Sequence, residues 1–117
     1  MNKNWQINFK EGNELVLSTC SKKCIPHANI VISLGFIDWK LLVADCQMVT
    51  TIKNLKENLH ICVVSKYCRL QGRVDISTSG KYFDICVKKS EDYEVKHALV
   101  ISVDTVFDLD KGEVLYS

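Results

Sequence analysis

Residues 40–58 read KLLVADCQMVTTIKNLKEN, which combines an apolar run, a polar turn and a short amphipathic stretch. The apolar run at residues 40–44 is typical of a buried strand. Thr50 and Thr51 then open a predicted helix with one apolar face. Backbone N–H groups and hydroxyls at such a helix start converge on one point, which is how small proteins bind a phosphate. The stretch therefore predicts a phosphate-binding strand-turn-helix, with plain helix capping by the two threonines as the alternative.

The rest of the chain alternates between strand and turn signals. The cleanest alternation of apolar and polar side chains is at residues 70–77. Strands are predicted at residues 14–20, 27–36, 40–45, 60–65, 70–77, 98–103 and 113–116, with residues 105–109 continuing or bending the strand before them, and helices at 49–58 and 80–89. The expected count is therefore six or seven strands. Tight turns rather than crossover helices join most of these strands. The pattern therefore favours an antiparallel, mainly β barrel over a parallel α/β sheet.

Size and charge restrict the classes of function. A chain of 117 residues predicts a single domain spanning residues 1–117. Fifteen basic and fourteen acidic residues leave a net charge of +1, so we expect no nucleic-acid partner. No apolar run approaches the roughly 18 residues of a membrane span, and the polar N-terminal sequence lacks the apolar core of a signal peptide. We therefore expect a cytoplasmic protein with no membrane partner.

The chain contains six cysteines and three histidines. The cysteines favour reduced thiols, several of them buried as small apolar groups, with a redox-active thiol or a metal ligand as alternatives. Zinc sites favour C-x-x-C pairs, whereas the nearest spacing here is Cys20-x-x-x-Cys24. The histidines His27, His60 and His97 are scattered, so the sequence predicts no metal site.

Three patterns, in this order, resemble the FMN-binding split-barrel superfamily, which includes pyridoxamine 5′-phosphate oxidase. Residues 17–31, LSTCSKKCIPHANIV, look like its opening hairpin, and residues 41–59, LLVADCQMVTTIKNLKENL, like the strand-turn-helix that holds the cofactor phosphate. Residues 71–83, QGRVDISTSGKYF, are similar to its strand that ends in Ser-Gly before a helix. The resemblance implies a mainly β, six-stranded antiparallel Greek-key split barrel with two or three short helices. It also implies a homodimer with FMN at the interface.

The resemblance further implies which residues bind FMN. Thr51 matches the family's Lys-Thr or Arg-Thr pair at the phosphate, whereas Thr50 replaces its cation. Residues 45–48 fill the turn that meets the flavin ring and ribityl chain, and residues 29–31 line the other edge of the ring. From the residues alone, the alternative for Met48 is a place in the core, and the alternative for Asn29 is a contact with an adjacent loop. The implied FMN-binding residues are Asn29, Ile30, Val31, Asp45, Cys46, Gln47, Met48, Thr50 and Thr51.

No residue of the sequence stands out as an essential acid or base, so no catalytic residue is identified. The leading hypothesis is an FMN flavoprotein of the pyridoxamine 5′-phosphate oxidase-like family. It would be an oxidoreductase or an electron carrier that exchanges electrons with a small-molecule donor or acceptor, with the flavin supplying the chemistry. The alternative is a degenerate split barrel that binds no flavin and acts as a ligand-binding or structural dimer, for which Thr50 is the main argument. Haem or metal binding through a histidine or cysteine is a third reading.

Overall fold

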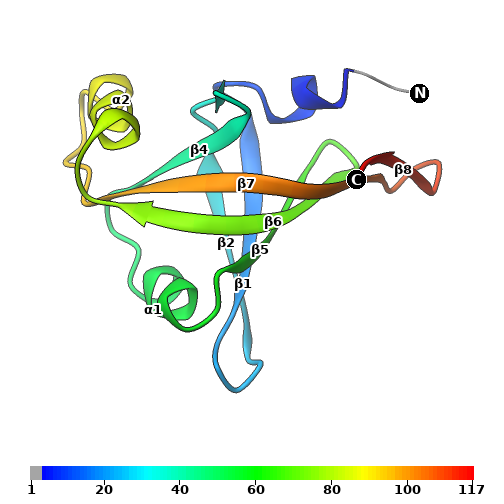
Figure 1. Cartoon of the computed structure of the whole chain (residues 1–117), viewed down its shortest axis with the longest axis horizontal. Helices are drawn as coiled ribbons and strands as arrows, with labels where there is room; N and C mark the ends of the chain where they lie inside the picture. Colours follow the sequence, from blue (N-terminus) through cyan, green and yellow to red (C-terminus); the bar gives the residue numbers. More distant parts are fainter. Residues whose placement is uncertain (1–3) are drawn as a thin grey trace.

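The computed structural model describes residues 4–117, which form one antiparallel β-sheet with two α-helices and a 3₁₀-helix (Figure 1). The elements are η1 (Trp5–Phe9), β1 (Glu14–Cys20), β2 (Pro26–Ile32), β3 (Phe36–Ile37), β4 (Lys40–Asp45), α1 (Thr50–Glu57), β5 (His60–Ser65), β6 (Cys68–Ser77), α2 (Lys81–Lys89), β7 (His97–Asp108) and β8 (Glu113–Tyr116). The mainly β class expected from the strand-and-turn pattern is confirmed.

The sheet coils on itself but stays open on one side. Its strand order is β2-β1-β5-β6-β7-β4-β3, and β8 pairs with β7. In Figure 1, β1 and β2 run steeply across the directions of β6 and β7. The connection between β2 and β3 is hydrogen-bonded on both sides. Ser33 N donates to Asn13 O (2.8 Å), just before β1, and Leu34 N donates to Leu42 O (2.9 Å) in β4. Among the described residues β2 pairs only with β1, so its other edge is unpaired. Residues of this edge and of β4 line one opening.

The expected count of six strands is wrong, because the described residues form eight. The predicted strand at residues 27–36 ends at Ile32. Its continuation is broken where the buried Ser33 hydroxyl donates to Phe9 O (2.6 Å) and accepts from Gly35 N (2.9 Å), and Gly35 takes a positive φ of 89°. The two-residue strand β3 then pairs with β4, which is too short a pairing for a period-two pattern to reveal.

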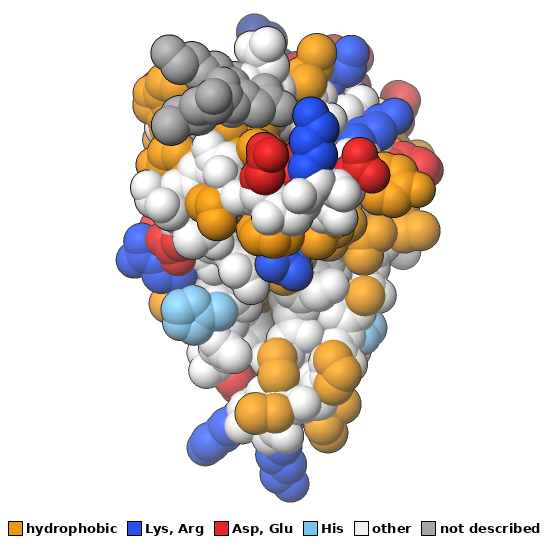
Figure 2. Space-filling model, turned by 90° about the vertical axis from the view of Figure 1, so that its right-hand side faces the viewer, with side chains coloured by type: hydrophobic (Ala, Val, Ile, Leu, Met, Phe, Trp, Pro, Cys, Tyr) orange, Lys and Arg blue, Asp and Glu red, His pale blue; other side chains and the backbone are white. Residues whose placement is uncertain are grey.

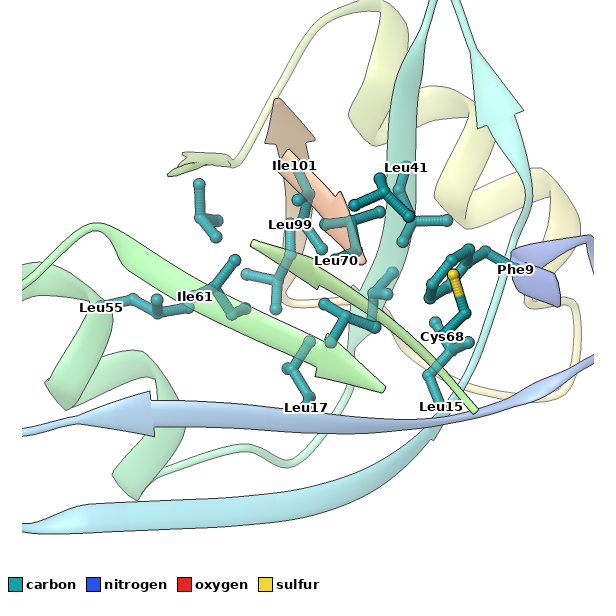
Figure 3. Close-up of a cluster of buried hydrophobic side chains, with 14 of the residues drawn as sticks. Phe9, Leu15, Leu17, Leu41, Leu55, Ile61, Cys68, Leu70, Leu99 and Ile101 are labelled. Carbon is teal, nitrogen blue, oxygen red and sulfur yellow. The ribbon is translucent and has the colours of Figure 1, made fainter. Parts of the chain in front are cut away.

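The main core fills the inside of the coiled sheet. Alternate residues of the strands point inward, and the labelled side chains Leu15, Leu17, Leu70, Leu99 and Ile101 converge there (Figure 3). Trp5 and Phe9 of η1 cover one end, with the rings of Trp5 and Phe36 meeting edge-to-face at 5.7 Å. A smaller cluster lies beneath α2. The main core lies inside the coiled sheet, and the opening between β2 and β4 lies beside it.

Candidate functional site

The opening between β2 and β4 contains a groove of about 520 Å³, which we call the apolar groove. Residues 30–32 of β2 form one wall, and Ala44, Cys46 and Gln47 form the other. The C-terminal part of α2 and the residues after it close the end of the groove with Lys89, Ser90 and Tyr93. Mostly apolar walls with a few polar groups are typical of sites for small organic molecules and cofactors. The groove therefore suits an aromatic ring system whose edge accepts hydrogen bonds.

A second pocket of about 430 Å³, which we call the basic pocket, lies between the β1–β2 turn and α1. The turn contributes Lys22 and Lys23, and α1 contributes Thr50, Lys53 and Glu57. The backbone N–H of Lys22 donates to Glu57 Oε1 (3.1 Å), which ties the turn to the helix. In Figure 2, blue side chains project from the bottom of the molecule, at the level of the β1–β2 turn in Figure 1. This pocket offers ammonium and hydroxyl groups to an anion.

The two pockets lie along the same strand. His27 of β2 lines the basic pocket, and Val31 of β2 lines the apolar groove. Because a strand rises about 3.3 Å per residue, these two positions are roughly 13 Å apart. Between them, Asn29 Nδ2 donates to Thr51 Oγ1 (2.5 Å) and joins β2 to the start of α1. An elongated ligand with a ring at one end and an anion at the other would match this arrangement.

Asp45 fixes the turn between β4 and α1 from inside the protein. Its side chain is fully buried, and Asp45 Oδ2 lies 2.5 Å from His97 Nδ1. Met48 N donates to Asp45 Oδ1 (2.6 Å), and Lys96 N donates to the Asp45 carbonyl (2.7 Å). The carboxylate is therefore occupied by protein groups, and it shapes the turn that presents Cys46 and Gln47 to the groove.

The nine residues expected at the site occupy different places. Four of them line the apolar groove, namely Ile30, Val31, Cys46 and Gln47. Thr50 is exposed in the basic pocket, whereas Asn29 and Thr51 are bonded to each other between the two pockets. Asp45 is buried against His97, and Met48 is half-buried and packs against the main core, as its alternative reading expected.

The capping alternative for the two threonines does not match the helix start. The N-cap position of α1 is Val49, and no side chain caps the helix by a hydrogen bond. The Thr51 hydroxyl instead accepts the Asn29 amide and is only 1% exposed. Thr50 is the one of the pair whose hydroxyl reaches solvent.

Sequence reasoning missed His97 and the lysines of the β1–β2 turn. His97 lies 52 residues from Asp45, and only the pairing of β4 with β7 brings them together. Lys22 and Lys23 stand in a polar turn, where lysines are ordinary surface residues. Their adjacency was visible in the sequence, but their position beside α1 depends on the fold.

All six cysteines carry free thiols. Burial raises the pKa of the Cys46 thiol beside the groove, and the charge of Asp45 raises it further. Burial also raises the pKa of Cys86, to about 11. These thiols are therefore protonated near neutral pH and behave as small apolar groups. Among residues 4–117, no three His, Cys, Asp or Glu side chains are grouped to hold a metal ion.

Several solved structures share this architecture. HupZ of Group A Streptococcus superposes with a TM-score of 0.83 at 19% identity, covering 97% of this chain and 98% of that one. An FMN-binding protein of Syntrophomonas wolfei gives 0.70 at 17% identity, covering 86% and 78%. A protein of the pyridoxinephosphate oxidase family from Clostridium acetobutylicum gives 0.64 at 15% identity, covering 89% and 85%. The chain has the fold of the FMN-binding split barrels.

A comparison of sequences adds a relative to these structures. A protein of Methanocaldococcus jannaschii described as uncharacterised is 26% identical over 113 residues, spanning 86% of this chain and 76% of its own length. No protein-family model matches the chain. None of the helices within residues 4–117 is long and apolar enough to cross a membrane.

Proposed function

We propose that the chain is an FMN-binding flavoprotein that works as an oxidoreductase or electron carrier, with FMN between the subunits of a homodimer. The observation that carries this proposal is the pairing of an apolar groove with a basic pocket along β2, in a fold that an FMN-binding protein of Syntrophomonas wolfei shares. FMN has the matching two-part chemistry, because it joins a flat ring to a phosphate through a flexible chain.

The residues present fit this cofactor. The walls at residues 30–32, Ala44 and Cys46 would pack on the ring, and the amide of Gln47 would hydrogen-bond its polar edge. The Thr50 hydroxyl would bind the phosphate, and the Asn29–Thr51 hydrogen bond would hold the two sides of the site together. When bound, FMN supplies the electron-transfer or hydride-transfer chemistry.

The homodimer is supported by an apolar row on the outer face of the sheet. Val16 of β1 lies between Ile30 of β2 and Val64 of β5 in the strand register. Ile30 is 72% exposed and its neighbour Ile32 is 50% exposed, which is unusual for aliphatic residues in the middle of strands. Because Ile30 and Ile32 also line the apolar groove, a second copy packed on this face would cover the flavin ring.

The protein's own contribution is binding and shielding. In the apolar groove the groups able to exchange protons are the Cys46 thiol, the Lys89 ammonium and the Tyr93 hydroxyl. The Cys46 thiol is a poor acid there because burial raises its pKa. We therefore propose electron exchange between FMN and a small-molecule donor or acceptor, and we assign no residue as a catalytic acid or base.

A flavin titration tests this proposal. Adding the purified protein to FMN should quench flavin fluorescence to saturation, and Gln47→Ala should weaken binding several-fold. Lys56→Ala is the control, because Lys56 is exposed on α1 and lines neither pocket. A protein that leaves FMN fluorescence unchanged would instead favour the second candidate, a flavin-free barrel, which the replacement of the usual cation by Thr50 supports.

A further inference from the structure

We propose that the basic pocket is a phosphomonoester site in which Lys22 and Lys23 of the β1–β2 turn supply the positive charge that Thr50 lacks. This inference rests on the proposed function, because the phosphomonoester it concerns is the one at the end of FMN. It adds binding residues on an element remote in sequence from α1.

The lining of the basic pocket is strongly cationic. Lys22, Lys23 and Lys53 face a single carboxylate, Glu57, and His27 adds a further nitrogen donor. Glu57 Oε1 already accepts the backbone N–H of Lys22. None of the ion pairs formed within residues 4–117 involves any of the three lysines. Unpaired ammonium groups around a pocket of this size attract an anion with several oxygens.

The turn that carries the two lysines is held in place. Cys24 N donates to Ser21 O (2.9 Å), and Ser21 N donates to Ile25 O (3.0 Å). The Ser21 hydroxyl also accepts from Ile25 N (3.0 Å), while Lys22 N reaches Glu57 on α1. A fixed turn loses less conformational entropy when a ligand binds than a free loop would. The backbone of the two lysines is therefore held beside α1, within reach of the pocket that Thr50 also lines.

The distance along β2 determines which part of the ligand can bind in the basic pocket. His27 is roughly 13 Å from Val31 of the apolar groove, at about 3.3 Å per residue. A ring bound in the apolar groove cannot also fill the basic pocket, so the group that arrives there is the far end of the ligand. In FMN that end is the phosphate, whereas riboflavin ends in a hydroxyl.

A comparison of FMN with riboflavin tests the inference. The protein, the double variant K22A/K23A and the control K56A/K66A, which removes two exposed lysines outside the basic pocket, are titrated with both flavins. We expect K22A/K23A to weaken FMN binding about tenfold or more and to leave riboflavin binding unchanged. The control should leave both affinities unchanged. Equal weakening of both flavins, or unchanged FMN binding, would overturn the role of the two lysines.

Inorganic phosphate separates this inference from the proposed function. If neither flavin binds the unmodified protein, the proposed function fails, and the pocket is then titrated with phosphate and followed by amide NMR. Saturable shifts at Lys22, Lys23, Thr50 and Lys53 that disappear in K22A/K23A would still support an anion site. The absence of such shifts, or equal shifts around Lys56 and Lys66, would refute it.

Discussion

The side-chain amide of Asn29 donates to the hydroxyl of Thr51 at 2.5 Å, and this bond joins the free edge of β2 to the first turn of α1. Thr51 is buried, whereas its neighbour Thr50 is exposed in the basic pocket. The two adjacent threonines therefore differ: the Thr51 hydroxyl is bonded within the protein, whereas Thr50 is the one proposed to bind the phosphate.

This difference makes a paired substitution informative. Thr51→Val keeps the shape of the side chain but leaves the Asn29 amide without its acceptor, so the free energy of unfolding should fall by about 1–3 kcal/mol. Thr50→Val should change it by less than about 0.5 kcal/mol, because the residue is exposed, and should weaken FMN instead. Urea unfolding and flavin titration of both variants check the assignment. Equal stability losses would argue against it.

The Asp45–His97 contact should be structural. His97→Ala leaves one oxygen of a fully buried carboxylate without its partner, which costs roughly 2–3 kcal/mol. His60→Ala is the matched control, because His60 is an exposed histidine on β5. Thermal or urea unfolding of the two variants measures the difference. Similar stabilities would mean that the contact contributes little to the turn.

Gly72 is required by the close approach of β6 to β7. A Cβ at this position would lie 2.0 Å from Ser102 O, next to the irregular register between Gln71 and Gly72. Gly72→Ala should therefore force the two strands apart and destabilise the protein by about 1–3 kcal/mol. In Gly80→Ala, the added methyl meets nothing within 4 Å and only the positive φ of 91° is unfavourable. A larger loss in the Gly80 variant would contradict this account.

The Cys86 thiol should make stability depend on pH in the alkaline range. Its pKa is raised to about 11 from an ordinary value of 9.0, chiefly by burial. Below pH 9 the thiol is protonated in both the folded and the unfolded chain, so its full contribution to the free energy of unfolding is present. As the pH rises from about 9 to about 11, only the unfolded chain releases the proton, and the free energy of unfolding falls.

Urea unfolding between pH 8 and pH 11 measures this effect. Cys86→Ala should show a shallower decline of the unfolding free energy than the unmodified protein. The smaller side chain of the variant lowers the unfolding free energy by the same amount at every pH, so it does not affect the comparison of slopes. Parallel slopes would show that Cys86 does not hold its proton more tightly in the folded state.

Local sequence patterns predicted the central strand-turn-helix closely. A strand was expected at residues 40–45 and is found at Lys40–Asp45, and the helix expected at 49–58 is Thr50–Glu57. An apolar run, a polar turn and an amphipathic period are properties of consecutive residues, so they can be read from the chain. The resemblance to the FMN-binding split barrels is confirmed at the level of the fold.

Features built from distant residues could not be predicted in this way. The contact of Lys22 with Glu57 spans 35 residues, and that of Asp45 with His97 spans 52. Nothing in their local sequence distinguishes Lys22 from an ordinary turn lysine or His97 from an isolated histidine. Only the strand pairing and the position of α1 reveal them, and the short strand β3 escapes prediction for the same reason.

Sedimentation with flavin detection measures whether FMN lies between two copies of the chain, as proposed above. The unmodified protein should sediment as a dimer carrying one FMN per subunit. Ile30→Glu places a charge on the exposed apolar row and should give a folded monomer that has lost FMN. A dimer without flavin, or an Ile30→Glu monomer that binds FMN as tightly as the dimer, would show that FMN does not bind between the subunits.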